Sequence, residues 1–146
     1  MQGSFDSHSA AETEMIGAEL AASLHPGDVV LIEGELGAGK TTLVRGAARA
    51  LGVKGPVTSP TFTIGQRYPA PVPVAHVDLY RVASLADEDP DLLTDYLGAD
   101  TIAFVEWPQG EAALAGLATI AARVRLEHRG GDLRRVSVGT PAGSAT

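Results

Sequence analysis

Gly34–Thr41 constrains this chain more than any other segment: its eight residues are Gly-Glu-Leu-Gly-Ala-Gly-Lys-Thr. They match the pattern G-x-x-x-x-G-K-[ST], in which a glycine-rich loop wraps its backbone N–H groups around a phosphate chain. An apolar run over residues 29–32 precedes the loop as a buried strand would, and a helix-compatible stretch over residues 41–51 follows it. Strand, loop and helix in this order predict a P-loop that binds a nucleoside triphosphate, in preference to a glycine-rich turn that holds no ligand.

The residue types within the loop suit this chemistry. Gly37 and Gly39 tolerate positive φ and present no side chain to an anion, so the backbone can close around the phosphates. The N-terminus of the following helix would face the β-phosphate. Lys40 would reach the β- and γ-phosphates, and the hydroxyl of Thr41 would ligate Mg²⁺.

The length and composition indicate a single domain over residues 1–146. Of the 146 residues, 45% are hydrophobic, which suffices for one core and leaves little room for a lid or a second substrate domain. We expect residues 1–8 and 140–146 to be frayed tails. The chain has no apolar stretch as long as a membrane span, no signal region at its N-terminus and no cysteine. These features predict a cytoplasmic protein that does not contact a membrane.

The net charge bears on the choice of partners. A formal charge of −7 argues against a protein that holds nucleic acid by itself, because such proteins normally carry a basic face. Arginines gather near the C-terminus and acids gather over residues 87–100. Solvated strand edges and a solvated helix face explain both clusters more simply than a docking surface for a protein partner does.

The spacing of apolar and turn residues predicts an α/β fold. A capping box at residues 9–12 opens a helix whose apolar stripe contains Ile16, Leu20 and Leu24. The pair Gly130–Gly131 separates the two strands of a C-terminal β-hairpin, at residues 123–127 and 134–138. Further strands are expected at residues 62–68, 74–79 and 101–105, and further helices at residues 91–97 and 111–117. The expected architecture is one P-loop NTPase-like domain with a mostly parallel central sheet and antiparallel additions.

Two acids end apolar strands downstream of the loop. Glu106 ends Ile-Ala-Phe-Val-Glu, and Asp78 ends Val-Ala-His-Val-Asp, where His76 interrupts the apolar run. Ligands bind near the carboxyl ends of strands in open α/β sheets, so either acid would line the site. One would hold the metal ion and the other would orient or activate the attacking water, and the pattern leaves the two roles undivided. For His76, a hydrogen-bonded strand histidine is favoured over a catalytic base.

Other candidates carry weaker signals. Trp107 either packs in the core or covers the nucleotide at the edge of the site. Residues 58–62, Thr-Ser-Pro-Thr-Phe, lie where many triphosphatases sense the γ-phosphate, although an ordinary Ser-Pro turn is favoured here. Arg81 would either stabilise transition-state charge or pair with the acidic run. The chain contains no asparagine, so a guanine-specific Asn-Lys-x-Asp element is impossible and ATP is the expected nucleotide.

Four motifs, taken together and in order, resemble the bacterial TsaE ATPases of tRNA N6-threonylcarbamoyladenosine biosynthesis. The motifs are Gly34–Thr42, Ser59–Thr63, His76–Arg81 and Val105–Pro108. The resemblance covers about residues 9–108 and is far more specific than a P-loop alone. The chain departs from the family in one place. Asp91-Leu92 stands where a Leu-Gly or Met-Gly pair is common shortly before an acid-Tyr pair, which is Asp95-Tyr96 in this chain. This departure bears on the local helix geometry and on any partner contact there.

The resemblance implies a small Mg²⁺-dependent ATPase with weak activity alone. It would bind the TsaB–TsaD pair, which places a threonylcarbamoyl group on adenosine 37 of tRNAs that read ANN codons, and it would contact tRNA only through that complex. The residues implied are Asp78, Lys40 and Glu106 for catalysis, Thr41 and Glu106 for Mg²⁺, and Gly37, Ala38, Gly39, Lys40, Thr41, Thr42, Trp107 and Thr13 for the nucleotide. Among these, Thr13 matches an N-terminal position that approaches the adenine.

Two other functions remain open at this stage. A small-molecule kinase would use the same loop, with Asp78 activating a hydroxyl acceptor, although an arginine-rich lid is missing from the sequence. A nucleotide-gated binding module would use the loop without appreciable hydrolysis. Transfer of labelled phosphate to an acceptor would indicate the kinase, and ATP-dependent partner capture without turnover would indicate the module.

Overall fold

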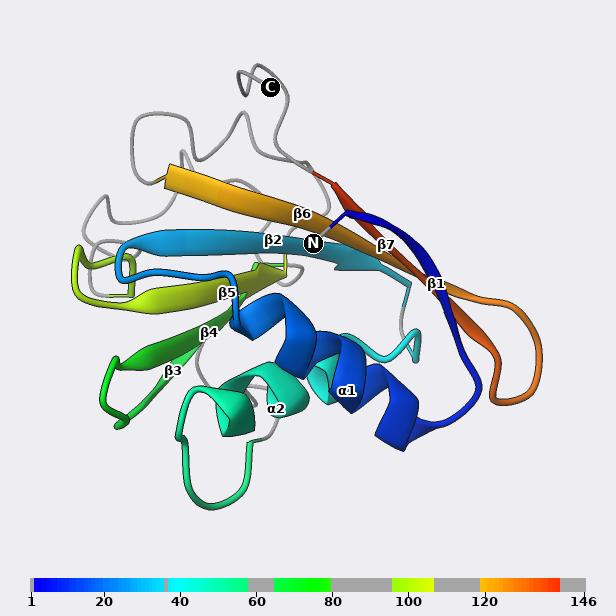
Figure 1. Cartoon of the computed structure of the whole chain (residues 1–146), viewed down its shortest axis with the longest axis horizontal. Coiled ribbons are helices and arrows are strands. Elements are labelled where there is room, and N and C mark those ends of the chain that lie inside the picture. Colours follow the sequence, from blue (N-terminus) through cyan, green and yellow to red (C-terminus); the bar gives the residue numbers. More distant parts are fainter. Residues whose placement is uncertain (1, 36, 58–64, 80–95, 107–118, 140–146) are drawn as a thin grey trace.

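A mixed β-sheet organises the part of the chain that the computed structural model describes, which is residues 2–35, 37–57, 65–79, 96–106 and 119–139 (Figure 1). Within these ranges seven strands lie in the order β1-β7-β6-β2-β5-β4-β3. The strands are β1 (Gly3–Ser7), β2 (Asp28–Gly34), β3 (Gly65–Tyr68), β4 (Val74–Asp78), β5 (Ile102–Glu106), β6 (Thr119–His128) and β7 (Arg134–Gly139), and the helices are α1 (Ala10–Ala21) and α2 (Lys40–Ala50).

The centre of the sheet is parallel and its edges are antiparallel. β2 pairs in parallel with both β5 and β6, and β5 pairs in parallel with β4. β3 adds to β4 at one edge, and β7 and β1 add beyond β6 at the other, all antiparallel. The predicted fold class, including the C-terminal hairpin, is confirmed. Because parallel strands end at the same edge, the carboxyl ends of β2, β4 and β5 lie together there.

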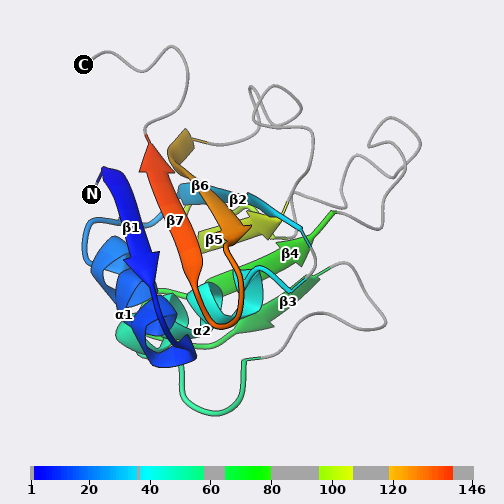
Figure 2. The same cartoon turned by 90° about the vertical axis from the view of Figure 1, so that its right-hand side faces the viewer.

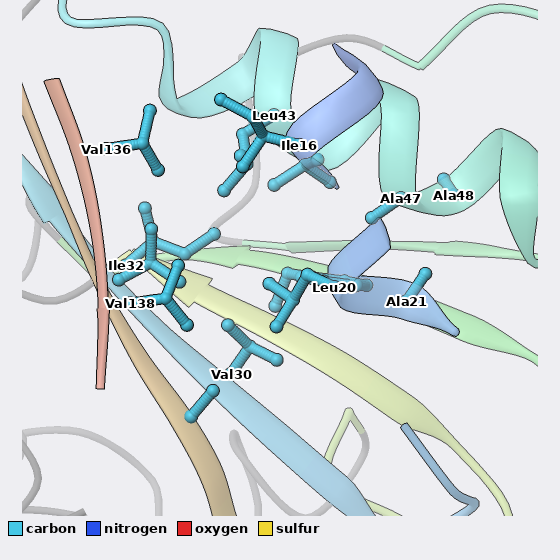
Figure 3. Packing of buried hydrophobic residues seen from close by; sticks show 14 of the residues in the cluster. Ile16, Leu20, Ala21, Val30, Ile32, Leu43, Ala47, Ala48, Val136 and Val138 are labelled. Carbon is cyan, nitrogen blue, oxygen red and sulfur yellow. The ribbon is translucent and has the colours of Figure 1, made fainter. Parts of the chain in front are cut away.

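Both helices cover one face of the sheet (Figures 1 and 2). The pleat directs alternate side chains of β2 to opposite faces, so Val30 and Ile32 point towards the helices. Figure 3 shows these two residues facing Ile16 and Leu20 of α1 and Leu43 of α2. A second buried cluster lies on the opposite face and comprises Val29, Leu31, Ala75, Val77, Leu79, Ala103 and Val105. The central strands are buried on both faces, which explains their continuous apolar runs.

The two helices pack in direct backbone contact where they cross. A Cβ at Gly17 of α1 would lie 2.2 Å from the carbonyl oxygen of Leu43, and one at Gly46 of α2 would lie 2.0 Å from that of Glu14. No side chain fits at either position without separating the helices. The crossing therefore holds the N-terminal half of α1 close to the helix that follows the P-loop.

The predicted helix start at the capping box is confirmed, with one difference in detail. The Ser9 hydroxyl accepts a hydrogen bond from the Glu12 N–H at 3.1 Å. The Glu12 carboxylate accepts one at 3.0 Å from the N–H of His8, one residue before the usual partner in a capping box. Leu24 lies beyond the end of α1 at Ala21 and packs, partly buried, against the same core.

The expectation that residues 1–8 form a frayed tail is wrong for Gly3–Ser7. This segment is strand β1, which pairs with all but the last residue of β7, Ser7 opposite Arg134 and Gly3 opposite Val138. Phe5 packs against the core and Ser7 is buried. The pairing partner lies about 130 residues away in the sequence, so local composition alone gave no indication of the strand.

The remaining predicted elements are confirmed only where the structure describes them. Residues 65–68 of the strand predicted over 62–68 form β3, and β4 and β5 match their predictions within one residue at each end. Tyr96 and Leu97, predicted to end a helix, lie in a turn. Residues 62–64, 91–95, 111–117 and 140–146 lie outside the described residues. Neither described helix is long and apolar enough to cross a membrane.

Candidate functional site

The P-loop connects the carboxyl end of β2 to the start of α2, as predicted. Gly37 has φ 82° and Gly39 has φ 100°, a left-handed backbone that residues with a Cβ rarely adopt. Gly39 is the N-cap of α2, and it offers no side chain to cap the first turn. The N–H groups of that turn therefore face the loop interior, the arrangement that binds an anion. Leu36 lies outside the described residues.

Lys40 lies between the loop backbone and one of the strand-end acids. Its Nζ donates a hydrogen bond to the Gly34 carbonyl oxygen at 2.6 Å and lies 3.8 Å from Oε1 of Glu106. The Lys40 side chain is only 11% exposed. The ammonium is thus held within the loop, next to a buried carboxylate, rather than extended into solvent.

Asp78 and Glu106 lie side by side at the ends of β4 and β5. The two residues are register partners across the parallel pair, and both are buried. The pleat places them on the helix-covered side, because Val74 and Phe104 of the same strands belong to the cluster beneath α1 and α2. This register places both acids at the edge of the sheet where β2 ends, and the expectation that either of them lines a ligand site stays a prediction. The division of catalytic roles between them stays a prediction.

His76 makes a contact that was not anticipated. The residue is fully buried in β4, and its Nε2 lies 2.6 Å from Oε2 of Glu106. The sequence signal was a histidine within an apolar strand, two residues before an acid and therefore on the same face. That signal does not show that β5 is the neighbouring strand. The pairing of β4 with β5 places His76 beside Glu106, which is 30 residues away in the sequence.

A cavity of about 160 Å³ borders the P-loop on the side of α1. Thr13 lines it, as do Gly37, Gly39 and Thr42. The Thr13 hydroxyl is already hydrogen-bonded, at 2.7 Å to Ser7 Oγ and at 3.3 Å to the Ser9 carbonyl. A Cβ at Gly39 would lie 3.8 Å from its Cγ2, so Thr13 presents its methyl group to the loop.

The turn of the β6–β7 hairpin forms the remaining wall of this cavity. Asp132 and Arg134 line it, and Arg134 pairs in register with Ser7, just before α1. The Arg134 guanidinium donates hydrogen bonds to the carbonyls of Gly131 and Leu133 at 2.9 and 3.1 Å, which hold it against the turn. Sequence reasoning treated these residues as part of an ordinary hairpin. Their only signal was an acid and an arginine next to a Gly-Gly turn, and that pattern is common on solvated hairpins.

A wider, open groove of about 510 Å³ lies on the other side of the loop entrance. It follows the carboxyl ends of β2 and β6, and its walls carry both charges, with Glu33 3.6 Å from Arg125 across the strands. Glu35 of the loop and Glu127 of β6 add two further carboxylates. The P-loop is therefore flanked by two hollows of different shape, a small one bounded by α1 and a broad charged one along β6.

The donor set beside the loop fits a magnesium ion. Thr41 supplies a hydroxyl in the first turn of α2, and Glu106 supplies a buried carboxylate. Mg²⁺ prefers such hard oxygen ligands and is usually bound through one or two protein groups together with substrate phosphates. Among the described residues there is no group of three or more His, Cys, Asp or Glu side chains that could hold a metal ion.

Several predicted site residues lie outside the described residues. They are Trp107, the Ser59–Thr63 segment, Arg81 and Asp91-Leu92. Their proposed roles stay predictions.

Comparisons with known proteins converge on one family. The family model described as threonylcarbamoyl adenosine biosynthesis protein TsaE matches residues 7–136. The tRNA threonylcarbamoyladenosine biosynthesis protein TsaE of Streptomyces coelicolor is 44% identical over 120 residues, which are 80% of each chain. The protein of the same name from Mycobacterium tuberculosis is 38% identical over 135 residues, covering 86% of this chain and 75% of the relative. The crystal structure of Bacillus subtilis YdiB superposes with a TM-score of 0.73 at 30% identity, over 96% of this chain and 86% of YdiB.

Proposed function

The chain belongs to the TsaE family of threonylcarbamoyl adenosine biosynthesis proteins, and from this premise we propose that it is a Mg²⁺-dependent ATPase. It would support the TsaB–TsaD complex in threonylcarbamoylation of adenosine 37 of tRNAs that read ANN codons. Family membership agrees with the resemblance inferred from the four sequence motifs. The observation that carries the ATPase proposal is the position of Lys40, within the P-loop and 3.8 Å from the buried Glu106 carboxylate.

The loop and Lys40 would bind the triphosphate. Backbone N–H groups of the loop and of the uncapped first turn of α2 would surround the β-phosphate. The Lys40 ammonium, which donates to the Gly34 carbonyl in this structure, would turn towards the β- and γ-phosphate oxygens. Both contacts neutralise charge that increases as the γ-phosphate leaves, so they would contribute to turnover as well as to affinity.

The two strand-end acids would divide the metal and water roles. Thr41 and Glu106 would hold Mg²⁺, which supplies charge stabilisation between the β- and γ-phosphates when bound. Asp78 would orient the attacking water and accept its proton. Adjacent register positions in β4 and β5 bring both carboxylates to the edge of the sheet where the loop begins, which supports a role for each acid beside the phosphates.

The cavity beside α1 would receive the nucleoside. Thr13 and Thr42 border it next to the loop, and Arg134 at the start of β7 also lines it. An arginine guanidinium can stack on a nucleobase or bond to a ribose hydroxyl. ATP is proposed as the nucleotide because the chain contains no asparagine and so cannot form the guanine-specific element.

Association with partners would supply the tRNA. The net charge of −7 disfavours independent binding to nucleic acid, in agreement with a protein that reaches tRNA only through TsaB–TsaD. The ATP cycle would then reset or remodel that complex between turnovers.

The test is ATP hydrolysis by the chain alone and with TsaB–TsaD and tRNA, with and without Mg²⁺. We expect weak Mg²⁺-dependent turnover alone and faster turnover in the complex. Glu106→Gln, which keeps the side-chain shape, should lower turnover on the order of 10²-fold and Asp78→Asn should do the same. Only the Glu106 variant should also need more Mg²⁺.

Three outcomes would contradict parts of this proposal. Labelled phosphate transferred to a nucleoside or sugar would indicate a kinase. Absence of turnover both alone and in the complex would indicate a nucleotide-gated binding module. An unchanged Mg²⁺ requirement in Glu106→Gln would move the metal role to Asp78.

A further inference from the structure

His76 is a buried polar group that the steps above do not use. It lies at the centre of β4, the strand next to the edge strand β3, and the residue is fully buried. Nε2 lies 2.6 Å from Oε2 of Glu106, a short charge-assisted hydrogen bond. Nδ1 is buried and has no hydrogen-bond partner within the described part of the chain. Burying such a group is unfavourable, so a polar residue at this position calls for an explanation beyond packing.

The contacts determine which ring nitrogen carries the proton. Glu106 lies 3.8 Å from the Lys40 ammonium and, as a carboxylate, can only accept a hydrogen bond. Nε2–H of His76 is therefore the donor. Nδ1 has no hydrogen-bond partner among the described residues, so Nε2 is the ring atom through which His76 acts on Glu106.

The hydrogen bond makes the two oxygens of Glu106 inequivalent. Oε2 is held by His76, and Oε1 points towards Lys40 and the P-loop. The distance of 3.8 Å from Oε1 to Lys40 Nζ is longer than the 2.7–2.9 Å typical of a charge-assisted hydrogen bond. Oε1 is thus directed at the loop but lies too far from Lys40 Nζ for a hydrogen bond. Without His76, the carboxylate would be free to rotate about its last side-chain bond.

We propose that His76 is a positioning residue: it anchors Oε2 of Glu106 so that Oε1 is presented to the metal site beside Thr41. The inference rests on the proposed function, because it assigns Glu106 to Mg²⁺. Residues that bind a metal ion are commonly hydrogen-bonded to a second residue, which orients the ligand without touching the ion. His76 would be that second residue for Glu106. A histidine that merely fills the core would affect stability and leave metal affinity unchanged.

The experiment measures Mn²⁺ affinity in the presence of ADP by electron paramagnetic resonance, with Mn²⁺ replacing Mg²⁺. His76→Leu removes the donor and keeps an apolar side chain in the core, and it should weaken Mn²⁺ binding about 10- to 100-fold. His76→Gln places an amide N–H near the position of Nε2 and should restore affinity to within about threefold of the original chain. Affinity for ADP in EDTA should be unchanged in both variants, because the loop contacts do not involve His76.

Matched controls separate positioning from folding. His25→Leu makes the same substitution at an exposed turn between α1 and β2, and it should leave Mn²⁺ affinity unchanged. Circular dichroism and thermal unfolding report whether each variant folds. If His76→Leu does not fold, the His76→Gln variant still tests the proposal. A folded His76→Gln protein whose Mn²⁺ affinity is about 10- to 100-fold weaker than that of the original chain would overturn the proposal.

A second readout needs neither metal nor nucleotide. In ¹⁵N-histidine-labelled protein, the Nε2–H proton of His76 should give a slowly exchanging, strongly downfield signal that shifts in Glu106→Gln. The same signal in both proteins would overturn the inference. Mn²⁺ affinity in His76→Leu equal to that of the original chain would overturn it too, while leaving the ATPase proposal intact. Failure of the original chain to bind Mn²⁺ with ADP would instead overturn the proposed function, and this inference with it.

Discussion

The two helices begin in opposite ways, although they pack against each other on the same face of the sheet. α1 is capped: the Ser9 hydroxyl accepts from the Glu12 N–H, and Glu12 places an acid in the first turn. α2 begins at Gly39, which is in a left-handed conformation with no side chain, and its first turn contains Lys40 and no acid. The start of α1 satisfies a donor with its own side chain, and the start of α2 has no side-chain cap for its donors. The absence of a side-chain cap thus distinguishes the helix start that adjoins the P-loop.

The capped helix nevertheless contributes to the function of the uncapped one. Backbone contact at Gly17 and Gly46 holds the helices together, and a Cβ at Gly39 would lie 3.8 Å from the Thr13 methyl carbon. The start of α1 therefore becomes a wall of the cavity beside the P-loop. Three substitutions test the contrast between the two helix starts and the contact that joins the helices. They are ordered from the largest expected effect to the smallest.

Removing the charge at the uncapped end should have the largest effect. Lys40→Ala deletes the ammonium that lies 3.8 Å from Glu106 and would reach the phosphates. Because the lysine would stabilise charge that develops on the γ-phosphate, we expect ATP turnover to fall on the order of 10²–10³-fold. The matched control is Lys54→Ala, which removes the other lysine of the chain from an exposed loop and should leave turnover unchanged. Equal turnover in the two variants would contradict the role assigned to the uncapped end.

Separating the helices should have an intermediate effect. Gly46→Ala gains about 1 kcal/mol of helix propensity but places a methyl group 2.0 Å from a backbone oxygen of α1, which cannot move alone. We expect a net loss of about 1–3 kcal/mol in the free energy of unfolding, measured by urea denaturation. Gly139→Ala is the control, since a Cβ there meets nothing within 4 Å. If both variants were equally stable, the close crossing would have no energetic role.

Deleting the cap of α1 should have the smallest effect. Ser9→Ala leaves the Glu12 N–H without its acceptor and should lower the free energy of unfolding by about 1 kcal/mol. Ser9→Asp supplies an equivalent acceptor and should retain the stability of the original chain. A loss as large as that of Gly46→Ala would mean that the cap, rather than the crossing, holds α1 in place.

The P-loop and the central strands were predictable because their signals are local. Eight consecutive residues define the loop, and apolar runs define β2, β4 and β5, which are buried on both faces. The apolar runs also predicted that Asp78 and Glu106 each end a strand. The β6–β7 hairpin followed from its Gly-Gly turn, and α1 from its cap.

The contacts that were missed all join residues distant in sequence. β1 forms only because β7 offers an edge about 130 residues later, and Asp132 and Arg134 border the cavity only because the hairpin turn folds towards α1. The bond from His76 to Glu106 requires parallel pairing of β4 with β5. Strand order is decided by long-range packing, which no window of local sequence contains.

The sequence by itself thus determined a P-loop motif, two strand-end acids and a resemblance to one family, since each is recognised from residue types in a fixed order along the chain. Only the tertiary structure decided which groups surround that loop. The register of β4 with β5 placed His76 on the Glu106 carboxylate, and the glycine crossing placed the capped end of α1 beside the uncapped end of α2. Both arrangements depend on close approach of backbones far apart along the chain, where hydrogen-bond register and steric fit decide which side chains meet.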